Sequence, residues 1–311
     1  MTGDIVLDAS AKTAMAAAPD KALVMKKESF TKDAPADYKW VAAEDGTLKL
    51  VPCEYVAQVG EGEDAVKYES LEKALEAIST VTTVNHPKSG LTINQYKANG
   101  TVTLLADCEG NGIVIDSGSE LTIDFAGHTY SVTGDLVGSD GTESQGFQLL
   151  KNSNVTFKST AEQPGVINSA KAIFLIQNYS NLTLEKMTLD GSNLSGSGAY
   201  TLSNNCGNVI INNSTITAKA GTGNFAFDVC RYSTYPSVNV TVKGESVING
   251  NVEVSATGSD AKDGFSLMLE AGTMTGEIVL DASAKAAMAA APEKALVMKS
   301  ESFIRKLSRM S

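Results

Sequence analysis

The feature that most constrains the fold is a motif that recurs every 27 residues in the middle of the chain. Its copies begin at Phe147, Phe174 and Thr201, and its second half recurs at Asn239 and Ser266. Each copy holds short β-branched strands separated by Asn, Gly and Ser, and none has room for a helix of ordinary length. A unit this small cannot bury its apolar residues alone, whereas stacked units share one continuous core. The sequence therefore predicts a mainly β chain built as a parallel solenoid.

Each unit is predicted to contain a strand, a tight turn, a second strand, a corner, a third strand and a loop, and the solenoid is expected over residues 101–280. In parallel stacking, equivalent positions of neighbouring units lie about 4.8 Å apart. Asn178 and Asn205 then align at a turn, either as an asparagine ladder or as separately solvated side chains. Two interior columns are expected, one of Ile173, Tyr200 and Phe225 and one of Leu175, Leu202 and Phe227.

The two ends of the chain are near copies of each other. Residues 1–30 recur at residues 274–303 with 26 of 30 positions identical. The first residue aligns with the interior residue Met274, which indicates a piece of a longer chain with a repeat period of 273 residues and a secretion signal upstream. The alternative is a coincidental start at a duplicated end. Gly3–Leu7 and Gly276–Leu280 would occupy equivalent places in successive modules, which would leave the first copy free to pair with another chain.

The N-terminal third differs in composition from the repeats. Glu44-Asp45-Gly46 between two alternating strands is a hairpin signal. Ser70 is a helix cap, and we expect the amphipathic helix after it to close the open end of the solenoid. The apolar face of that helix consists of Leu71, Ala74, Leu75 and Ile78.

These features divide the chain into four regions. A short helix is expected at Ala9–Ala18 and again in its copy at Ala282–Ala291, and residues 80–100 are expected to be a connector. The regions are residues 1–31, the terminal segment of a preceding repeat; 32–100, a hairpin, capping helix and connector; 101–280, the solenoid; and 281–311, a C-terminal segment with a divergent tail.

Three segments carry a family resemblance. Tyr68–Leu75, Thr101–Asp107 and Leu121–Tyr130 resemble modules of large secreted surface proteins of gut bacteria. The resemblance implies a pectate-lyase-like, right-handed parallel β-helix with a small N-terminal hairpin-plus-helix cap, in an adhesin-like repeat protein. This fold carries lyases, hydrolases, phage spikes and inert stalks, so the resemblance indicates architecture rather than activity.

The first functional hypothesis is a non-catalytic extracellular module of a bacterial tandem-repeat surface protein, a stalk or an adhesin. A polysaccharide lyase or glycoside hydrolase is the alternative, and a phage receptor-binding spike is a third, disfavoured one. Such hydrolases need several carboxylates on one exposed strand face. The expected column of Leu149, Ile176, Ser203 and Asp228 holds one, and Arg231 nearby suggests a solvated ion pair. We therefore assign no catalytic residue, no cofactor and no metal ligand.

The charge balance narrows the partners. The chain carries 36 acidic and 25 basic side chains, a formal net charge of −11. An acidic surface repels phosphate, so nucleic acid is not expected as a partner, and no apolar run approaches the roughly 18 residues of a membrane span. The expected partners are host or dietary glycans, a host surface protein and adjacent modules of the same parent chain. The expected location is extracellular or at the cell surface.

Two pairs of side chains are candidates for specific roles. Cys206 and Cys230 fall one position apart in neighbouring units, so they are candidates for a disulfide bond, with free buried thiols as the alternative. Tyr232 and Tyr235 add exposed rings suited to stacking on sugars, with a plain solvated spacer as the alternative. Glycine- and serine-rich loops are expected to project from one edge, where a solenoid can vary freely. They are Gly134–Gly146, Asp190–Gly198, Ala218–Asn224 and Ser255–Gly264.

Overall fold

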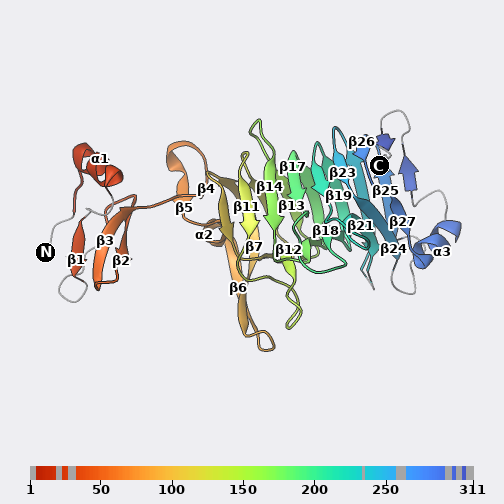
Figure 1. The fold of residues 1–311 in the computed structure, drawn as a ribbon, viewed down its shortest axis with the longest axis horizontal. Coiled ribbons are helices and arrows are strands. Elements are labelled where there is room, and N and C mark those ends of the chain that lie inside the picture. Colours follow the sequence, from red (N-terminus) through yellow and green to blue (C-terminus); the bar gives the residue numbers. More distant parts are fainter. Residues whose placement is uncertain are drawn as a thin grey trace. The chain divides into compact units, whose positions relative to one another are not determined.

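A computed structural model shows how the chain folds (Figure 1). The residues that it describes are 5–18, 23–26, 33–232, 235–256, 264–290, 296–298 and 303–305. The chain divides into two compact units, Met1–Tyr55 and Val56–Ser311. The predicted boundary at residue 32 is therefore misplaced, because the N-terminal hairpin belongs to the first unit and the capping helix to the second.

The first unit is a three-stranded antiparallel sheet with one helix. The strands pair in the order β1-β3-β2, and the predicted hairpin is confirmed, with Gly46 at the left-handed φ of 79° in its turn. Met15 and Leu50 form the small core of this unit. Its elements are α1 (Ala9–Ala17), β1 (Val24–Lys26), β2 (Tyr38–Ala42) and β3 (Thr47–Pro52).

The helix predicted after Ser70 lies near the start of the second unit. The Ser70 hydroxyl accepts a hydrogen bond of 3.2 Å from the Lys73 amide at the start of α2 (Leu71–Ala77), and the helix buries its apolar face in the main core. The expected connector is instead an antiparallel hairpin of β6 (Ser79–His86) and β7 (Leu91–Leu104). Thr80–Val84 alternates as a strand, and a Pro/Gly turn follows it, which is a hairpin signal that the prediction overlooked. The remaining elements here are β4 (Ala57–Val59), η2 (Gly62–Asp64) and β5 (Val66–Tyr68).

The rest of the second unit is mainly β, with many strands in parallel sheets. Each repeat contributes one strand to each of three parallel stacks. Stack 1 contains part of β7, then β10 (Glu120–Asp124), β13 (Asn154–Lys158), β16 (Asn181–Glu185), β19 (Gly207–Asn212), β22 (Val238–Lys243), β25 (Phe265–Leu269) and β28 (Leu296–Met298). Stack 2 contains β8 (Cys108–Gly110), β11 (Thr129–Val132), β14 (Gly165–Ser169), β17 (Met187–Asp190), β20 (Thr215–Thr217), β23 (Val247–Asn249), β26 (Gly272–Met274) and β29 (Phe303–Arg305). Stack 3 contains β9 (Ile113–Ile115), β12 (Gln145–Leu149), β15 (Phe174–Asn178), β18 (Tyr200–Asn204), β21 (Phe225–Arg231), β24 (Asn251–Ala256) and β27 (Ile278–Leu280), and helix α3 (Ala282–Ala290) follows β27.

The register confirms the 27-residue spacing in stack 1 and corrects it in stack 3. Asn154 pairs with Asn181 in stack 1, as expected. In stack 3, however, Tyr200 pairs with Phe174 and not with Ile173. The loops that lead into stack 3 differ in length, so an alignment without gaps slips there.

The expected interior columns are therefore one residue out of place. The buried column is Ile176, Leu202 and Phe227 rather than the one that begins at Leu175, although Leu175 is also buried. The other column is Phe174, Tyr200 and Phe225, and Phe174 and Tyr200 are only half-buried. Its rings are stacked, with centroids 5.6 Å and 5.1 Å apart.

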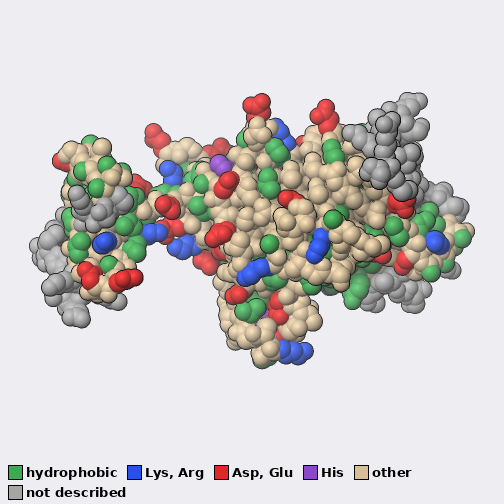
Figure 2. Space-filling model, in the orientation of Figure 1, with side chains coloured by type: hydrophobic (Ala, Val, Ile, Leu, Met, Phe, Trp, Pro, Cys, Tyr) green, Lys and Arg blue, Asp and Glu red, His purple; other side chains and the backbone are tan. Residues whose placement is uncertain are grey.

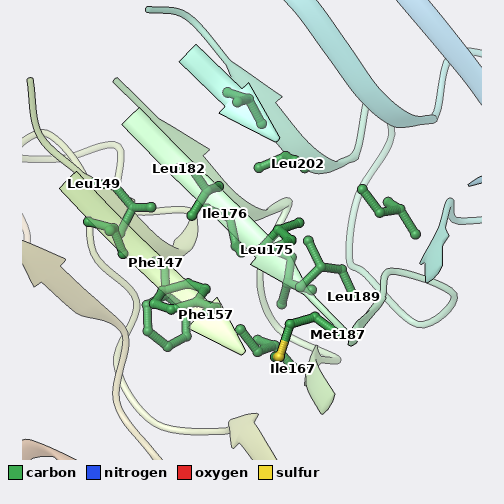
Figure 3. Packing of buried hydrophobic residues seen from close by; sticks show 14 of the residues in the cluster. Phe147, Leu149, Phe157, Ile167, Leu175, Ile176, Leu182, Met187, Leu189 and Leu202 are labelled. Atoms are coloured by element: carbon green, nitrogen blue, oxygen red, sulfur yellow. The ribbon is translucent and has the colours of Figure 1, made fainter. Parts of the chain in front are cut away.

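The core between the stacks is continuous and apolar (Figure 3). Phe147 and Phe157 meet edge to face, with ring centroids 5.5 Å apart, and both are fully buried. Burying a side chain of this size stabilises a fold by about 1.5–3 kcal/mol. An asparagine ladder is present, but it joins Asn178 Nδ2 to Asn204 Oδ1 at 3.2 Å, so Asn205 is not the ladder residue.

Three of the four predicted loops occupy equivalent places. Those after β11, β17 and β20 each lead from stack 2 to stack 3. The fourth, Ser255–Gly264, instead leads from stack 3 to stack 1, so the expectation of one common edge for all four loops is wrong. Residues 257–263 of that loop lie outside the described residues.

Candidate functional site

A cleft of about 520 Å³ lies at the turns that lead from stack 3 to stack 1. We call it the tyrosine cleft, because Tyr179 and Tyr235 both line it. Its lining consists of Lys151, Asn152, Tyr179, Asn181, Cys206, Gly207, Asn208, Tyr235, Pro236 and Ser237.

The repeat itself positions the floor of the cleft. Asn152, Tyr179 and Cys206 occupy the same turn position in three successive repeats. Asn152 has the left-handed φ of 63°, which asparagine tolerates better than most residues. The stack therefore displays three different side chains, one per repeat, along one line of turns.

An insertion supplies the wall of the cleft that carries Tyr235. The interval from Asn208 to its equivalent Asn239 is 31 residues instead of 27, and the extra length lies in the turn that holds Tyr235. The Tyr235 ring lies 4.9 Å from the Tyr179 ring, centroid to centroid, with 40° between their planes. Lys151 Nζ lies 6.0 Å from the Tyr235 centroid, at the outer limit of a cation–π contact.

A ladder of asparagine amides borders the rings. Asn181 Nδ2 donates to Asn154 Oδ1 at 2.8 Å, and the Asn208 backbone N–H donates to Asn181 Oδ1 at 2.9 Å. Asn239 Nδ2 continues the ladder to Asn208 Oδ1 at 3.0 Å. An asparagine amide offers both donors and an acceptor, and Asn181 uses its Nδ2 toward Asn154 and its Oδ1 toward Asn208.

The hydroxyl group of Tyr179 in the cleft remains neutral. Burial raises the pKa of Tyr179 above its usual value, and the neighbouring Tyr235 raises it further. Tyr179 is therefore protonated at any physiological pH, and its hydroxyl can both donate and accept. The cleft thus presents apolar ring faces, neutral hydroxyl and amide groups, and one lysine.

The two tyrosines predicted to contact glycans lie close together, with ring centroids 6.4 Å apart, but only one of them lines the cleft. Tyr235 lines the cleft, whereas Tyr232 does not line it and is 47% exposed. The prediction missed Tyr179, although the 27-residue alignment places it beside Asn152 and Cys206. The long interval before Asn239 indicates that extra residues are inserted next to this position.

The predicted disulfide bond is not formed. Cys206 and Cys230 are both buried, and no disulfide bond joins them. Cys206 lies in the turn after β18, whereas Cys230 lies inside β21 and pairs with Ser255 of the next repeat. The predicted register overlooked this difference, and Cys206 belongs to the floor of the cleft.

A second group of interest lies on stack 3, where two carboxylates occupy neighbouring strands. The true column is Gln148, Gln177, Ser203, Asp228 and Glu253, so the prediction of a single carboxylate is wrong. Asp228 accepts hydrogen bonds from the Asn204 backbone N–H and, at 3.3 Å, from the Ser203 hydroxyl. The Tyr200 hydroxyl donates to Glu253 Oε2 at 2.6 Å.

The surroundings of Asp228 are those of a structural acid. Burial raises its pKa to about 8, with a smaller contribution from the nearby Glu253. Asp228 is 5% exposed, so the solvated ion pair expected with Arg231 does not describe it. Arg231 Nε instead donates to the Pro236 carbonyl at 3.2 Å, in the turn that carries Tyr235.

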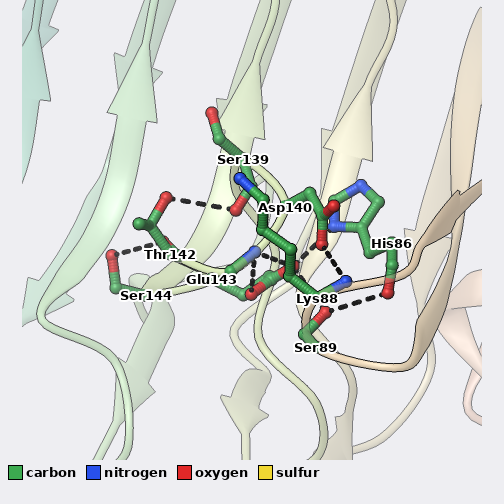
Figure 4. A network of polar contacts seen from close by, with 9 residues as sticks. His86, Lys88, Ser89, Ser139, Asp140, Thr142, Glu143 and Ser144 are labelled. Carbon is green, nitrogen blue, oxygen red and sulfur yellow. Dashed lines mark hydrogen bonds and ion pairs between the residues drawn. The ribbon is translucent and has the colours of Figure 1, made fainter.

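A third polar group joins the β6–β7 turn to the loop before β12 (Figure 4). His86 Nδ1 lies 2.6 Å from Glu143 Oε1, and the Ser89 hydroxyl donates to the same oxygen at 2.7 Å. The Lys88 backbone N–H donates to Asp140 Oδ1 at 2.9 Å. His86 is the first cause of the fall of the Glu143 pKa to about 2.

The same group contains residue types that bind metals. Ligand atoms of His86, Asp140 and Glu143 lie within 4.8 Å of one another. Both Glu143 oxygens already accept from the Gly141 backbone N–H at 3.1 Å. These contacts complete a hydrogen-bonded tether between two chain segments, and we assign the group that role.

Comparison with family models, with curated proteins and with solved structures found no match to this chain. The helices in the described part of the chain are all too short or too polar to span a bilayer.

Proposed function

We propose that the second unit is a right-handed parallel β-helix closed at one end by α2. Three observations support this architecture: one strand per repeat in each stack, parallel pairing throughout the stacks, and a common apolar core. Stacked repeats of this kind bury what a single repeat leaves exposed. A crystal structure would test the proposal through the hand of the winding and the closure of the three stacks.

We further propose that the chain is a non-catalytic extracellular module of a bacterial tandem-repeat surface protein, a stalk or an adhesin, that binds glycans in the tyrosine cleft. The observation that carries this proposal is that the rings of Tyr179 and Tyr235 lie together beside the asparagine ladder that runs through Asn181. Aromatic faces bury the C–H faces of sugar rings, and amides bond their hydroxyl groups. Host and dietary glycans are the ligand class.

The surface charge is consistent with neutral or cationic ligands. On the face drawn in Figure 2, acidic and basic side chains are both scattered over a surface that consists mainly of uncharged groups. With a formal net charge of −11, the chain repels polyanions. Lys151 is the cation of the cleft, and it approaches Tyr235 rather than a carboxylate.

A glycan array with Tyr235→Ala tests the assignment. Removing the ring should weaken binding roughly tenfold or more, the equivalent of about 1.4 kcal/mol. Tyr232→Ala is the matched control, because this tyrosine lies in the same turn but outside the cleft. Equal losses in the two variants, or no glycan bound by the wild type, would contradict the proposal.

The alternative function is that of a polysaccharide lyase or glycoside hydrolase, and the neighbouring carboxylates of Asp228 and Glu253 are the observation in its favour. Burial and the hydrogen bond to backbone leave Asp228 poorly placed to reach a substrate. Assays for new reducing ends and for unsaturated products separate the two functions. We expect neither product, and turnover would favour the enzyme.

A further inference from the structure

The segment Leu-Val-Met occurs in both end copies, and it pairs with a different strand in each. In the first copy its Val24 and Met25 belong to β1, which pairs antiparallel with β3 of the hairpin. In the second copy it is β28, which pairs parallel with β25 of stack 1. The same sequence therefore pairs in two different sheets, and the backbone hydrogen bonds show which edge of the strand faces each sheet.

In the first copy, the edge toward the hairpin is formed by Leu23 and Met25. The Leu50 N–H donates to the Leu23 carbonyl at 2.9 Å. In an antiparallel ladder every second residue directs its N–H and carbonyl to the same neighbour, so Met25 also faces β3. Val24, between them, directs its backbone groups away from the hairpin.

In the second copy, backbone hydrogen bonds join β25 to the preceding strand of stack 1, β22. The Val238 N–H donates to the Gly264 carbonyl at 2.8 Å, and the Glu270 N–H donates to the Val242 carbonyl at 2.8 Å. Residues 264, 266, 268 and 270 therefore face β22. Leu267 and its alternate neighbours face the other way, toward β28.

The direction of β28 follows from that of β25. Leu267 pairs with Leu296 and Leu269 pairs with Met298. In a parallel ladder, a residue that faces its neighbour bonds to the two residues that flank its partner. Val297 therefore faces β25, and Leu296 and Met298 direct their backbone groups away from it.

The two copies thus use opposite edges of the same strand. Val297 corresponds to Val24, and Met298 corresponds to Met25. The first copy pairs with the hairpin through the edge that contains Leu23 and Met25. The second copy pairs with β25 through the opposite edge, at Val297. One strand could therefore carry both sets of hydrogen bonds at once.

We propose that this strand is a junction between copies of the chain. It pairs on one edge with β25 of one copy and on the other with β3 of the next, so β28 of one chain replaces β1 of another against the β2–β3 hairpin. The partner is a second copy of this chain, and the contact is head to tail. Heterologous contacts of this kind build linear assemblies, and each one covers an open strand edge.

The helix beside the strand fits the same junction. Helices α1 and α3 have the same bounds in the two copies. Met15 of the first copy is buried against Leu50, whereas its equivalent Met288 is only partly buried. Ala284 of the second copy is fully buried in the main core, whereas its equivalent Ala11 is half-buried. Each copy covers one part of the helix and leaves the other partly open.

Proline substitutions in the full chain test the junction, because proline removes one N–H. Met25→Pro removes an N–H that faces the hairpin, so the hairpin should release β1 and take β28 of another chain. We expect the molar mass from light scattering to rise with concentration. Val24→Pro is the matched control, since its N–H faces away, and it should behave as the wild type. Met25→Ala controls for the loss of the side chain.

A second proline substitution distinguishes association through the junction from association caused by misfolding. Met298→Pro removes an N–H from the edge that the hairpin would take but leaves the bonds to β25. In the Met25→Pro background it should return the chain to a monomer with an unchanged circular dichroism spectrum. Monomeric Met25→Pro, or a double variant as associated as the single one, would overturn the proposal. Glycan binding in the tyrosine cleft is independent of either result.

Discussion

At the scale of single residues, Asp228 shows how a buried acid replaces missing backbone partners. The regular pairing of β18 with β21 ends at Leu202 and Phe227, and the carboxyl group of Asp228 then accepts from the Asn204 N–H. Asn204 Nδ2 returns a bond of 3.0 Å to the Asp228 carbonyl. A buried acid that stays protonated satisfies these groups without the cost of a buried charge.

Stability should therefore depend on pH through Asp228. Folding raises its pKa from 3.8 to about 8, so its contribution is complete below 3.8 and is lost as the pH rises toward 8. The slope is at most about 1.4 kcal/mol per pH unit. Asp228→Asn is neutral at every pH and removes this dependence.

Urea unfolding of the wild type and Asp228→Asn at several pH values measures the difference. The variant should gain on the wild type as the pH rises through this window. Glu253→Gln controls for the neighbouring carboxylate. A constant difference in unfolding free energy between about pH 4 and pH 8 would contradict the assigned protonation.

At the scale of elements, the β6–β7 hairpin is held at its far end by one polar group. His86 and Glu143 come from segments 57 residues apart, and their side chains are 7% and 8% exposed. The Glu143 carboxylate keeps its charge down to a pH of about 2, so the tether should survive mild acid. Loss of its histidine partner leaves that carboxylate without its shortest hydrogen bond.

His86→Ala should loosen the hairpin turn and the loop of Glu143 together. Hydrogen exchange measures this as faster exchange of the Lys88 and Gly141 amides, which both donate to the acidic side chains of the group. Thr83→Val is the control, because it removes an exposed hydrogen bond to Asn94 within the same hairpin. If only the β6–β7 turn responds, the two segments are not coupled.

The elements also show how far sequence reasoning reaches. Periodicity predicted the stacked strands. The cap residue Ser70 and the apolar face of the segment after it predicted α2, because both signals are local. The register of stack 3 depends on loop lengths, so Tyr200 was aligned with Ile173 instead of Phe174. Tyr179 meets Tyr235 only across an insertion, and no local pattern reports such a contact.

The duplicated ends make the same point within one chain. The Leu-Val-Met strand is antiparallel in one copy and parallel in the other, so its partner is set by its surroundings. The helix beside it is the same in both copies, because Asp8 and Asp281 each cap it with a carboxylate bond to a backbone N–H, at 2.7 Å and 2.6 Å. Helix ends follow local sequence, whereas strand pairing does not.

At the scale of the whole molecule, stability passes from repeat to repeat. Strands in each stack pair with the repeats before and after them, so a local defect should act mainly on its neighbours. Helix α2 covers the first strands, and its Leu71 and Leu75 are fully buried in the main core. The strands that it covers are the place where unfolding of the parallel stacks should begin if that cover is weakened.

Leu75→Ala tests this directional loss. A buried leucine replaced by alanine costs about 2–5 kcal/mol, depending on how well the site collapses. Hydrogen exchange should accelerate first in β7 and β8, beside the helix, and less in β19 and β22, several repeats away. Ile211→Ala in β19 is the central control, because this side chain is also fully buried and loses a similar volume. That variant should instead accelerate exchange on both sides of its own repeat. Equal acceleration along the whole unit in both variants would show a single cooperative block rather than coupled repeats.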